Sequence, residues 1–553
     1  MRNKPIVFAV IVALGLALLV FQGAMVHAQI GEPGGMPEGI RESALTSSNG
    51  QLDNGLHQVT DAYAIIEKNF ATNVEPDRAF YQGAIPGMLS TLDPHSSFLD
   101  PVEYANMQRT QRAQYSGVGM LITVDEGNTV SMEPFPGSPA QVAGLRRGDI
   151  IAAVDGVNTL GMNSQKVADM LRGQRSTTVH VTVRRPGVAD PITFAVVRGD
   201  ISTSVVDAYW LQPGIVYLGI SSFEASNVSH DVEAALAKLG ENKVTGMIFD
   251  LRGNPGGLVN EAVAVVGRFL ADGQTVVSDH GRAQPERVYR AKAQPLAQDY
   301  PIVTMVNRGS ASASEIVSGA LQDHDRAWLL GETTFGKGLV QAQFPLSEGA
   351  ALLLTIAHYY TPSGRLIQRD YNNQSFFDYY YSPRKDQPQS QTDIKATDSG
   401  RKVYGGGGIT PDEKYEAPSP CAPLYVATPN NRFQARVYGA ANEKFFHFGS
   451  LYFGGQQPHL PSPTWIPDAE TLDRFKTFLK SQQMDFTDDE FNANRQWISD
   501  NLRLELLQRA YDKNTAVRAL MMDDPEVHKA IESLPKAQAL LARRGATQRA
   551  SLR

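Results

Sequence analysis

The sequence predicts a multidomain α/β protein, and three observations carry that prediction. The chain has 553 residues, which at roughly 150 residues per domain suggests three or four domains. Strand and helix patterns alternate through residues 200–370, as they do in an α/β layer. Short glycine-punctuated strands occupy residues 115–200, and residues 464–545 are mostly helical.

The composition is that of a folded globular chain and excludes several classes. Hydrophobic residues make up 42% and charged residues 20%, so the chain is neither disordered nor a polytopic membrane protein. A net charge of -7 argues against nucleic acid as the main partner. The single cysteine, Cys421, excludes an internal disulfide framework and a cysteine-rich metal centre. It also fits an oxidising compartment.

The first 28 residues have the features of an export signal. Arg2 and Lys4 precede an apolar run from Ile6 to Val20, and small residues lead to a cleavage site after Ala28. An uncleaved membrane anchor is the competing interpretation, because the uncharged stretch is long enough to span a bilayer. Polar residues at its far end favour the cleaved signal. Either way, we expect an exported, periplasmic chain, free or anchored to the membrane.

A flexible tether and a helical segment follow. Residues 29–50 are rich in Gly, Pro and Ser and are expected to form the tether. The segment 51–112 begins with an amphipathic helix at Leu56–Phe70 and continues with a short helix at Arg78–Leu92. Three residues of the next turn look like a hydrolase triad on paper, but they lie too close in sequence to converge on one atom. These are Asp93, His95 and Ser96.

Residues 113–200 carry the pattern of a small β domain. A strand starts within Gly117-Val-Gly-Met-Leu-Ile-Thr-Val124, a short helix is expected at Ser164–Leu171, and a final strand at Val179–Val183. The order of its glycine loop, Pro-Gly-Ser-Pro-Ala turn and Asp-Gly hairpin resembles a PDZ domain of the bacterial protease type. A small β-barrel without a ligand is the alternative.

A PDZ domain implies peptide capture by strand addition. The C-terminal end of a peptide would add beside Met120–Thr123, and backbone N–H groups of the preceding loop would hold its carboxylate. The residues expected to bind the peptide are Gly117, Val118, Gly119 and Met120.

Residues 201–385 are predicted to form an α/β core that residues 386–420 complete. The expected strands and helices are Val216–Ser221, helix Asn227–Leu239, Met247–Leu251, helix Val259–Leu270, Ile302–Val306, a helix ending near Leu321, Trp328–Leu330 and Ala350–Tyr360. The glycine run Gly405–Gly408 is not expected to bind a nucleotide, since no helix follows it. Residues 421–553 are predicted to be a mostly helical domain, with a capping box at Thr487–Glu490.

The strongest site candidate is Gly309-Ser-Ala-Ser-Ala-Ser-Glu315, at a strand-to-helix turn. A serine at the start of a helix lies in a positive field among free N–H groups, which favours an oxyanion. Helix capping by the same hydroxyls is the structural alternative. The residues alone do not distinguish among Ser310, Ser312 and Ser314, and Glu315 is expected to be a helix-start residue.

A general base for such a serine is indicated by Thr333-Thr-Phe-Gly-Lys-Gly338. Lys337 lies between two glycines that allow close packing. Desolvation lowers the pKa of a lysine, and only the neutral amine can accept the serine proton. Gln341, four residues on, falls on the same side and can orient the amine. Ser533 and Lys536 repeat the spacing of another Ser–Lys motif, but they lie in a polar helical region and are treated as coincidence.

These motifs together resemble the C-terminal-processing peptidases, also called tail-specific proteases, from about residue 52 to residue 412. The matching segments are Gly87-Met-Leu-x-x-Leu-Asp-Pro-His-Ser-Ser97, the PDZ module, Asp250-Leu-Arg-x-Asn-Pro-Gly-Gly-Leu258, Val306-Asn-Arg-Gly-Ser-Ala-Ser-Ala-Ser-Glu315, Gly336-Lys-Gly-x-Val-Gln341 and Tyr359-Tyr-Thr-Pro-Ser-Gly-Arg-x-Ile-Gln368. The resemblance implies a ClpP/crotonase-like α/β peptidase core with an inserted PDZ domain. It does not extend over residues 420–553.

The resemblance also implies the site. Ser312 is the nucleophile, Lys337 the general base and Gln341 the residue that orients the lysine. The oxyanion hole takes the N–H of Ala313 and one from the Asn-Pro-Gly-Gly turn, Gly257 before Gly256. Asp250 and Arg252 are expected to fix that turn, and Arg172 is a candidate for coupling the PDZ domain to the core.

The expected function is that of an exported serine endopeptidase that binds protein C-termini and cleaves near them without a metal or organic cofactor. A homodimer, an adaptor or activator protein, and membrane association through the N-terminus stay open as partners, and nucleic acid is not expected. The rivals are a non-catalytic PDZ scaffold or holdase on the same fold and an acyl-CoA hydratase-like enzyme. The presence of Ser312, Lys337 and Gln341 speaks against the scaffold, and the PDZ insert with the Ser–Lys pair speaks against the hydratase-like enzyme.

Overall fold

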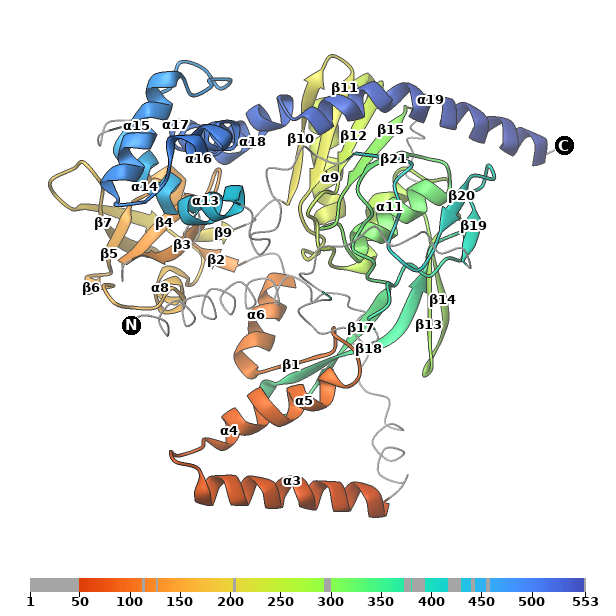
Figure 1. Ribbon diagram of the computed structural model, residues 1–553, viewed down its shortest axis with the longest axis horizontal. Helices are drawn as coiled ribbons and strands as arrows, with labels where there is room; N and C mark the ends of the chain where they lie inside the picture. The colour runs from red at the N-terminus through yellow and green to blue at the C-terminus, as the bar shows by residue number, and fades with distance from the viewer. Residues whose placement is uncertain are drawn as a thin grey trace.

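The computed structural model has three regions in Figure 1: the core sheet with its helices on the right, a small β unit with the C-terminal helices on the left, and the N-terminal helices at the bottom. Described residues are 49–111, 115–125, 128–201, 205–292, 300–371, 379, 393–415, 429–438, 443–453 and 458–551. The expected export signal, most of the tether and Cys421 lie outside them. Among the described helices, none combines the length and the apolar character needed to cross a bilayer.

The N-terminal helices project from the rest of the molecule, at the bottom of Figure 1. The expected first helix is α3 (Asn49–Asn69), which starts within the segment assigned to the tether. The second is broken into three pieces, because a π-helical turn separates two short α-helices; the pieces are α4 (Pro76–Ala79), η1 (Phe80–Ala84) and α5 (Ile85–Ser90). Strand β1 (Ser97–Leu99) and helix α6 (Pro101–Gln111) lead onward.

The PDZ unit is a sheet in the order β3-β4-β5-β7-β8, with β6 paired to β5. Its strands are β3 (Met120–Asp125), β4 (Asn128–Pro134), β5 (Ile150–Val154), β6 (Val157–Asn158), β7 (Thr178–Arg184) and β8 (Ile192–Val197). The short helices are α7 (Pro139–Ala143) and α8 (Ser164–Leu171), the latter with the predicted bounds. The prediction that Val179–Val183 ends the unit is wrong, because β8 pairs with β7 along its length.

The peptidase core is a six-stranded sheet in the order β10-β11-β12-β15-β16-β21, parallel except for its first strand. The strands are β10 (Val206–Gln212), β11 (Ile215–Ile220), β12 (Gly246–Asp250), β15 (Ile302–Val306), β16 (Trp328–Gly331) and β21 (Glu413–Lys414). Four were expected from sequence. The sixth comes from the segment after the glycine run, whose N–H groups bond to the core: Gly406 N donates to Leu366 O and Gly408 N to Ile367 O.

Both faces of this sheet are covered. Helices α9 (Val228–Leu239), α10 (Val259–Gly267) and α11 (Ala313–Asp323) pack on one face around Leu218, Phe249 and Val306. Helix α10 ends three residues before the predicted end. On the other face Ile248 and Met305 contact α19 (Pro525–Ser551), the long helix that runs across the top of Figure 1.

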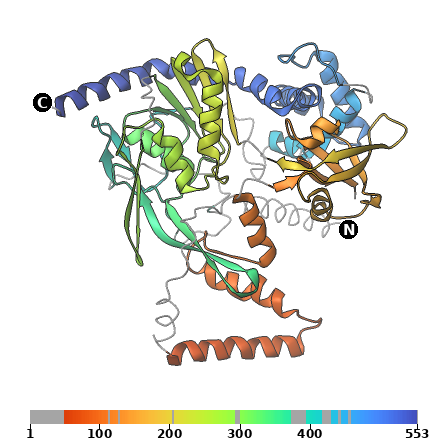
Figure 2. The same cartoon turned by 180° about the vertical axis from the view of Figure 1, so that it is seen from behind.

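A second sheet extends below the core. Its order is β1-β18-β13-β14, with β17 also on β18. The strands are β13 (Thr275–Gly281), β14 (Gln284–Arg290), β17 (Leu339–Pro345) and the expected β18 (Ala351–Tyr360). Figure 2 shows β17 and β18 reaching from the core toward the N-terminal helices. The sheet therefore brings residues near 95, 340 and 355 together.

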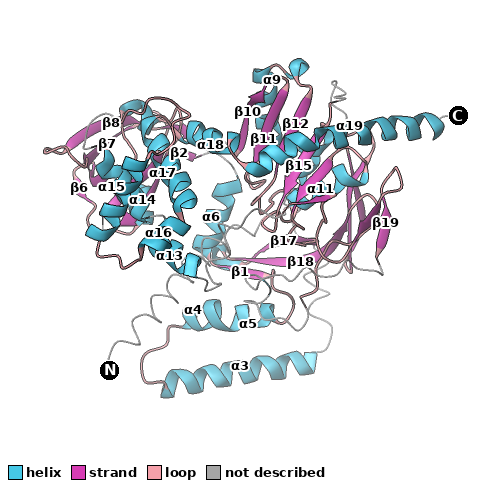
Figure 3. Cartoon of the chain, turned by 45° about the horizontal axis from the view of Figure 1, so that its top comes forward, coloured by secondary structure: helices cyan, strands magenta, loops and turns pink. Residues whose placement is uncertain are grey.

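Residues 429–551 form the C-terminal extension. Its first helices gather beside the PDZ strands (Figure 3), and α19 then crosses to the peptidase core. The helices are α13 (Pro429–Tyr438), α14 (Glu443–Tyr452), α15 (Ala469–Ser481), α16 (Asp488–Ala493), α17 (Arg495–Ala510) and α18 (Lys513–Met522). The capping box expected at Thr487 is confirmed, because its hydroxyl accepts from Glu490 N and Glu490 accepts from Thr487 N.

Candidate active site

The three serines before α11 have different surroundings. The Ser310 hydroxyl donates to Leu251 O at 2.8 Å, and the Ser314 hydroxyl donates to Asn254 O at 3.0 Å. Both side chains are fully buried and tie the nucleophile loop to the turn after β12. Ser310 and Ser314 thus bond to the turn after β12, whereas Ser312 stands at the N-cap of α11 as the candidate nucleophile.

Ser312 also has an unusual backbone. Its φ of 55° and ψ of -115° lie in a region of backbone angles that residues other than glycine rarely adopt. Such conformations persist only where the surrounding structure imposes them, and they are common at active sites. The residue stands directly before the first turn of α11, whose N-terminus carries partial positive charge.

The Asn-Pro-Gly-Gly turn lies against Ser312. A methyl group at Gly256 would come within 2.7 Å of the Ser312 Cβ, Ala311 O and Ala313 N. Only glycine allows this approach, and its φ of 98° also requires glycine. Asn254 attaches the turn to strand β11, because its Nδ2 donates to Ile220 O at 2.8 Å.

The two candidate glycines of the oxyanion hole differ. Gly256 N donates to Asn254 Oδ1 at 2.9 Å, so its hydrogen is already used. The N–H groups of Gly257 and Ala313 donate to nothing within the described residues. This geometry favours Gly257 with Ala313, the pair that the family resemblance implies.

Lys337 is a buried amine, with only 2% of the residue exposed. Its Nζ donates to Gln341 Oε1 at 3.0 Å, and Gln341 Nε2 donates to His95 O at 2.6 Å. Burial lowers the pKa of Lys337 to about 8, against the attraction of Asp93 and Glu315. A substantial neutral fraction therefore exists at mildly alkaline pH, as a general base requires.

Glu315 does more than the predicted helix-start role. One carboxylate oxygen accepts from both Ser312 N and Lys337 N, each at 2.8 Å. The other accepts from Thr334 Oγ1 at 2.5 Å and Gly336 N at 2.7 Å. All four groups donate, so the ionised carboxylate satisfies them. The serine-bearing loop and the lysine-bearing loop are held together at one fully buried group.

Burial raises the pKa of Glu315, and the four donors oppose that rise. Sequence reasoning identified this residue only as a cap, because its partners lie 19 to 22 positions away. The signal in the sequence was the glycine-flanked loop itself, whose free N–H groups require an acceptor.

The Asp93 segment is a supporting turn, in agreement with the structural interpretation of the sequence. Asp93 accepts from His95 N, Ser96 N and the Ser96 hydroxyl, all at 2.7 Å. The His95 ring lies 3.0 Å from the Tyr379 hydroxyl. The segment thereby presents His95 O to Gln341, a connection that the sequence alone did not indicate.

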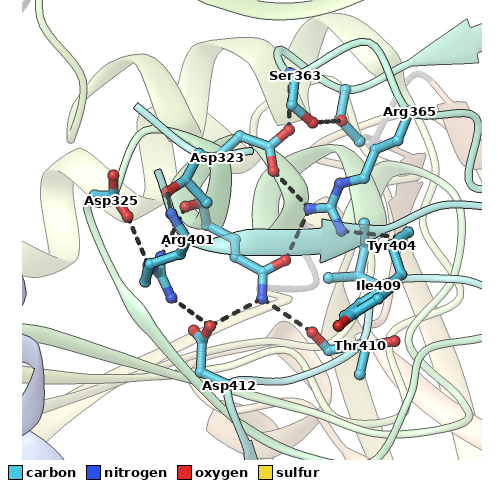
Figure 4. Close-up of polar contacts among 12 residues, drawn as sticks. Asp323, Asp325, Ser363, Arg365, Arg401, Tyr404, Ile409, Thr410 and Asp412 are labelled. Carbon is cyan, nitrogen blue, oxygen red and sulfur yellow. Dashed lines mark hydrogen bonds and ion pairs between the residues drawn. The ribbon is translucent and has the colours of Figure 1, made fainter. Parts of the chain in front are cut away.

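A buried polar network holds the far end of α11 (Figure 4). Asp323 pairs with Arg365 at 2.6 Å, and both side chains are almost fully buried. Arg401 binds Asp325 at 2.7 Å and also contacts Asp412. The network attaches residues 393–412 to the helix that begins at Ser312.

The PDZ loop has the features expected of a carboxylate site. The carbonyls of Val118 and Gly119 accept from Ala140 N and Phe135 N, while their own N–H groups donate to nothing within the described chain. Strand β3, which begins at Met120, pairs only with β4 among the described strands, so its outer edge is available. Gly117 ends β2 (Tyr115–Gly117), which pairs with β9 (Gly199–Ile201).

Arg172 is the C-cap of α8 and forms an ion pair with Asp169 at 2.8 Å. Both residues belong to the PDZ domain. Its coupling role therefore stays a prediction.

Comparisons with known proteins agree with this architecture. Residues 214–372 match the model of peptidase family S41, residues 131–185 that of a PDZ domain, and residues 27–102 that of the activating protease CtpB N-terminal domain. The match to the peptidase model covers the strands and loops that hold Ser312 and Lys337. The chain is therefore a serine-type peptidase with a PDZ domain.

Relatives define the family more closely. A carboxy-terminal-processing protease of Bartonella bacilliformis is 37% identical over 60% of this chain and 76% of its own length. Another, of Synechocystis, is 41% identical over 52% of this chain and 68% of its own length. The solved photosystem II D1 C-terminal processing protease is 34% identical, with a TM-score of 0.32, over 55% of this chain and 83% of that one.

The chain belongs to the carboxy-terminal-processing protease family. The predicted family, fold class and enzyme class are confirmed. The family match favours a peptidase over the scaffold and the hydratase-like enzyme.

Proposed function

We propose that this chain is an exported serine endopeptidase that captures protein C-termini with its PDZ domain and cleaves near them with a Ser312–Lys337 dyad. The observation that carries the proposal is the buried Lys337 amine, which Gln341 holds while Glu315 joins its backbone to that of Ser312. Names of the relatives, which are proteases that process carboxy termini, support the choice of substrate end.

The reaction would proceed by acyl transfer. Ser312 Oγ attacks the scissile carbonyl carbon while neutral Lys337 takes the hydroxyl proton. The Ala313 and Gly257 N–H groups stabilise the oxyanion of the tetrahedral intermediate. The protonated lysine then gives its proton to the leaving amine, and the C–N bond breaks. Neutral Lys337 then deprotonates a water molecule, which hydrolyses the ester between Ser312 and the acyl part of the substrate.

Gln341 would keep the lysine amine directed at Ser312 throughout. Its own amide is anchored on His95 O, so it can accept only from the side on which the lysine stands. The orientation costs no rearrangement during the reaction, as preorganised sites require.

Substrate capture would use the free edge of β3. A substrate C-terminus adds a strand there, and the N–H groups of Val118 and Gly119 bind the carboxylate. The rest of the chain must be extended to reach Ser312, which favours unfolded or flexible C-terminal segments.

The N-terminal arm is proposed to pair with a second copy of the chain. One face of α3, with the residue after it, leaves apolar side chains about half exposed or more, namely Leu56, Val59, Ile66 and Phe70. Such contiguous apolar faces are typical of protein contact sites. Sedimentation of the purified chain should give a dimer, and Leu56→Glu with Phe70→Glu should give a monomer.

Export and membrane attachment are proposed from the basic start and apolar run of the first 28 residues. Sequencing the N-terminus of the protein recovered from its host distinguishes a cleaved signal from an anchor. An adaptor or activator that docks on the PDZ domain or the extension would appear in the same material as a co-purifying protein.

The deciding test is cleavage of an unfolded protein with a free apolar C-terminus by residues 29–553 and by its Ser312→Ala variant. We expect cleavage by the parent chain and none by the variant. Equal cleavage by both would exclude Ser312 as the nucleophile. A variant at Ser318, whose hydroxyl donates to Ser314 O within α11, serves as the control and should stay active.

A further inference from the structure

The turn that provides Gly257 is held from outside the peptidase core by the C-terminal extension. Arg252 stands at the beginning of this turn, and its N–H donates to Asp250 Oδ1 at 2.9 Å. Its guanidinium also binds both oxygens of Asp250, with contacts from 2.7 to 3.1 Å. These contacts use Nε and Nη2 and leave the third nitrogen for other partners.

That nitrogen, Nη1, is bound by two carboxylates at the start of α19. Glu526 Oε2 lies at 2.7 Å and Asp524 Oδ2 at 2.9 Å. The side chains of Arg252, Glu526 and Asp524 are 16%, 9% and 17% exposed. Because these side chains are mostly buried, dissolved salt screens their ion pairs much less than it screens surface pairs. The planar guanidinium of Arg252 also fixes the geometry of the contacts.

The start of α19 is itself rigidly placed. The Asp524 side chain accepts from Glu526 N at 2.8 Å, and Val527, Ala530 and Leu534 are buried against the core sheet. The carboxylates of Asp524 and Glu526 therefore hold the Arg252 guanidinium in a fixed position.

From Arg252 the turn runs directly to the catalytic loop. Gly253 N donates to Asn307 Oδ1 at 2.8 Å, and Asn254 O accepts from Ala311 N at 3.0 Å. Two residues further on, Gly256 touches Ser312. A shift of Arg252 would be transmitted along this short segment to the N–H of Gly257.

We propose that Asp524 and Glu526 are positioning residues of the reaction: through Arg252 they set the oxyanion turn against Ser312. The extension is then a part of the active-site scaffold. This inference rests on the proposed oxyanion hole of Gly257 and Ala313.

The test is the isosteric double variant Asp524→Asn with Glu526→Gln in the full chain. Asparagine keeps the cap on Glu526 N, so α19 is expected to stay formed. We expect kcat to fall about tenfold with KM unchanged within twofold, since misplacing an oxyanion donor costs less than its complete loss, roughly 10²–10³ in kcat. Glu526→Asp, which retains both carboxylates, should recover most of the rate.

The matched control is Glu413→Gln. Glu413, on the edge strand β21, pairs with Lys536 of α19 at 2.7 Å and accepts from the Ser533 hydroxyl at 2.8 Å, and among the described residues it makes no contact with Arg252. The Glu413→Gln variant weakens the attachment of α19 to the core sheet but leaves the carboxylates that bind Arg252 in place. Its kcat should therefore stay within twofold of the parent. An equal fall in both variants would mean that α19 only anchors the fold, and the proposal would be overturned.

A second readout isolates the oxyanion. A peptide aldehyde forms a hemiacetal with the nucleophile, and its oxygen occupies the oxyanion hole. Its inhibition constant should rise by the same factor as kcat falls, while binding of an uncleaved peptide to the Ser312→Ala background stays unchanged. A double variant with parental kcat and aldehyde inhibition would refute the positioning role. Activity surviving in Ser312→Ala would instead refute the proposed function.

Discussion

Around Lys337, the balance between burial and charge decides when the amine can act. Burial favours the neutral amine, whereas Asp93 and Glu315 favour the charged one, and burial prevails. Because the neutral form is the base, it is present above the pKa of about 8 and is lost as the pH falls through that value.

The first prediction concerns this pH dependence. The kcat/KM for a peptide without titrating side chains should rise about tenfold per pH unit below 8 and level off above it. Lys337→Arg should be inactive at every pH, because a guanidinium stays protonated. A rate maximum at acidic pH would contradict the role of Lys337 as base.

Glu315 provides a second prediction at the residue scale. Glu315→Gln should reduce kcat by about 10², because an amide nitrogen would face two N–H or O–H donors where an acceptor is needed. Ser318→Ala removes another buried hydrogen bond of α11 and should leave kcat within twofold. Comparable losses in both variants would indicate general weakening of the helix.

The glycines of the oxyanion turn allow a matched comparison. Gly256→Ala should abolish cleavage, since its methyl group would collide with Ser312 and Ala313. Gly253→Ala also carries a positive φ of 68° but meets open space, so it should cost stability of about 1 kcal/mol or more and retain most activity. Cleavage assays with thermal melting of both variants separate the two effects.

At the scale of elements, the free edge of β3 determines what the PDZ domain can bind. Strand addition requires an unpaired edge and a pocket for the terminal carboxylate. Within the described chain, the Val118 and Gly119 N–H groups of the β2–β3 loop meet no other acceptor and are left for that carboxylate. A peptide with an amidated C-terminus should therefore bind the Ser312→Ala chain at least tenfold more weakly than the free acid, as calorimetry would measure. Equal affinities would remove this loop from the binding site.

Helix α11 is also fixed at both of its ends. Its beginning is held by Glu315 and its end by the Asp323–Arg365 pair. The nucleophile thus stands on a helix that has little freedom to slide or rotate.

For the whole molecule, the extension joins the PDZ domain to the peptidase core. Glu505 of α17 is fully buried between Arg147 of the PDZ domain at 2.6 Å and Arg509 at 2.7 Å. At the other end α19 covers the core sheet. The relative placement of the two domains is therefore built by a segment to which the family resemblance does not extend.

The last prediction tests this joint. Glu505→Gln leaves two buried guanidinium groups uncompensated, which costs about 3–5 kcal/mol in the docked arrangement. The radius of gyration measured by X-ray scattering should increase as the PDZ domain separates. Lys513→Met breaks an exposed pair with Glu133 at 3.7 Å in the same interface, worth about 1 kcal/mol or less, and should leave the scattering unchanged.

The sequence by itself determined the order of the units and the chemistry of the loops. Periodic apolar residues identified β12, β15, α8 and α11, because buried strands and amphipathic helices need those patterns. Strands β13, β14 and β17 escaped detection, since their mixed polar faces are stabilised by pairing within the second sheet, where β13 and β17 pair with β18 and β14 pairs with β13. The glycines around Gly256 and Lys337 already signalled close backbone approach.

Only the tertiary structure decided which groups meet. It separated Ser312 from Ser310 and Ser314, because the hydroxyl partners of the other two lie about 60 residues away in the chain. It likewise joined Glu315 to Lys337, His95 to Gln341 and Glu526 to Arg252. Such contacts depend on how strands and helices from distant segments pack, and a local pattern records the need for a partner without identifying it.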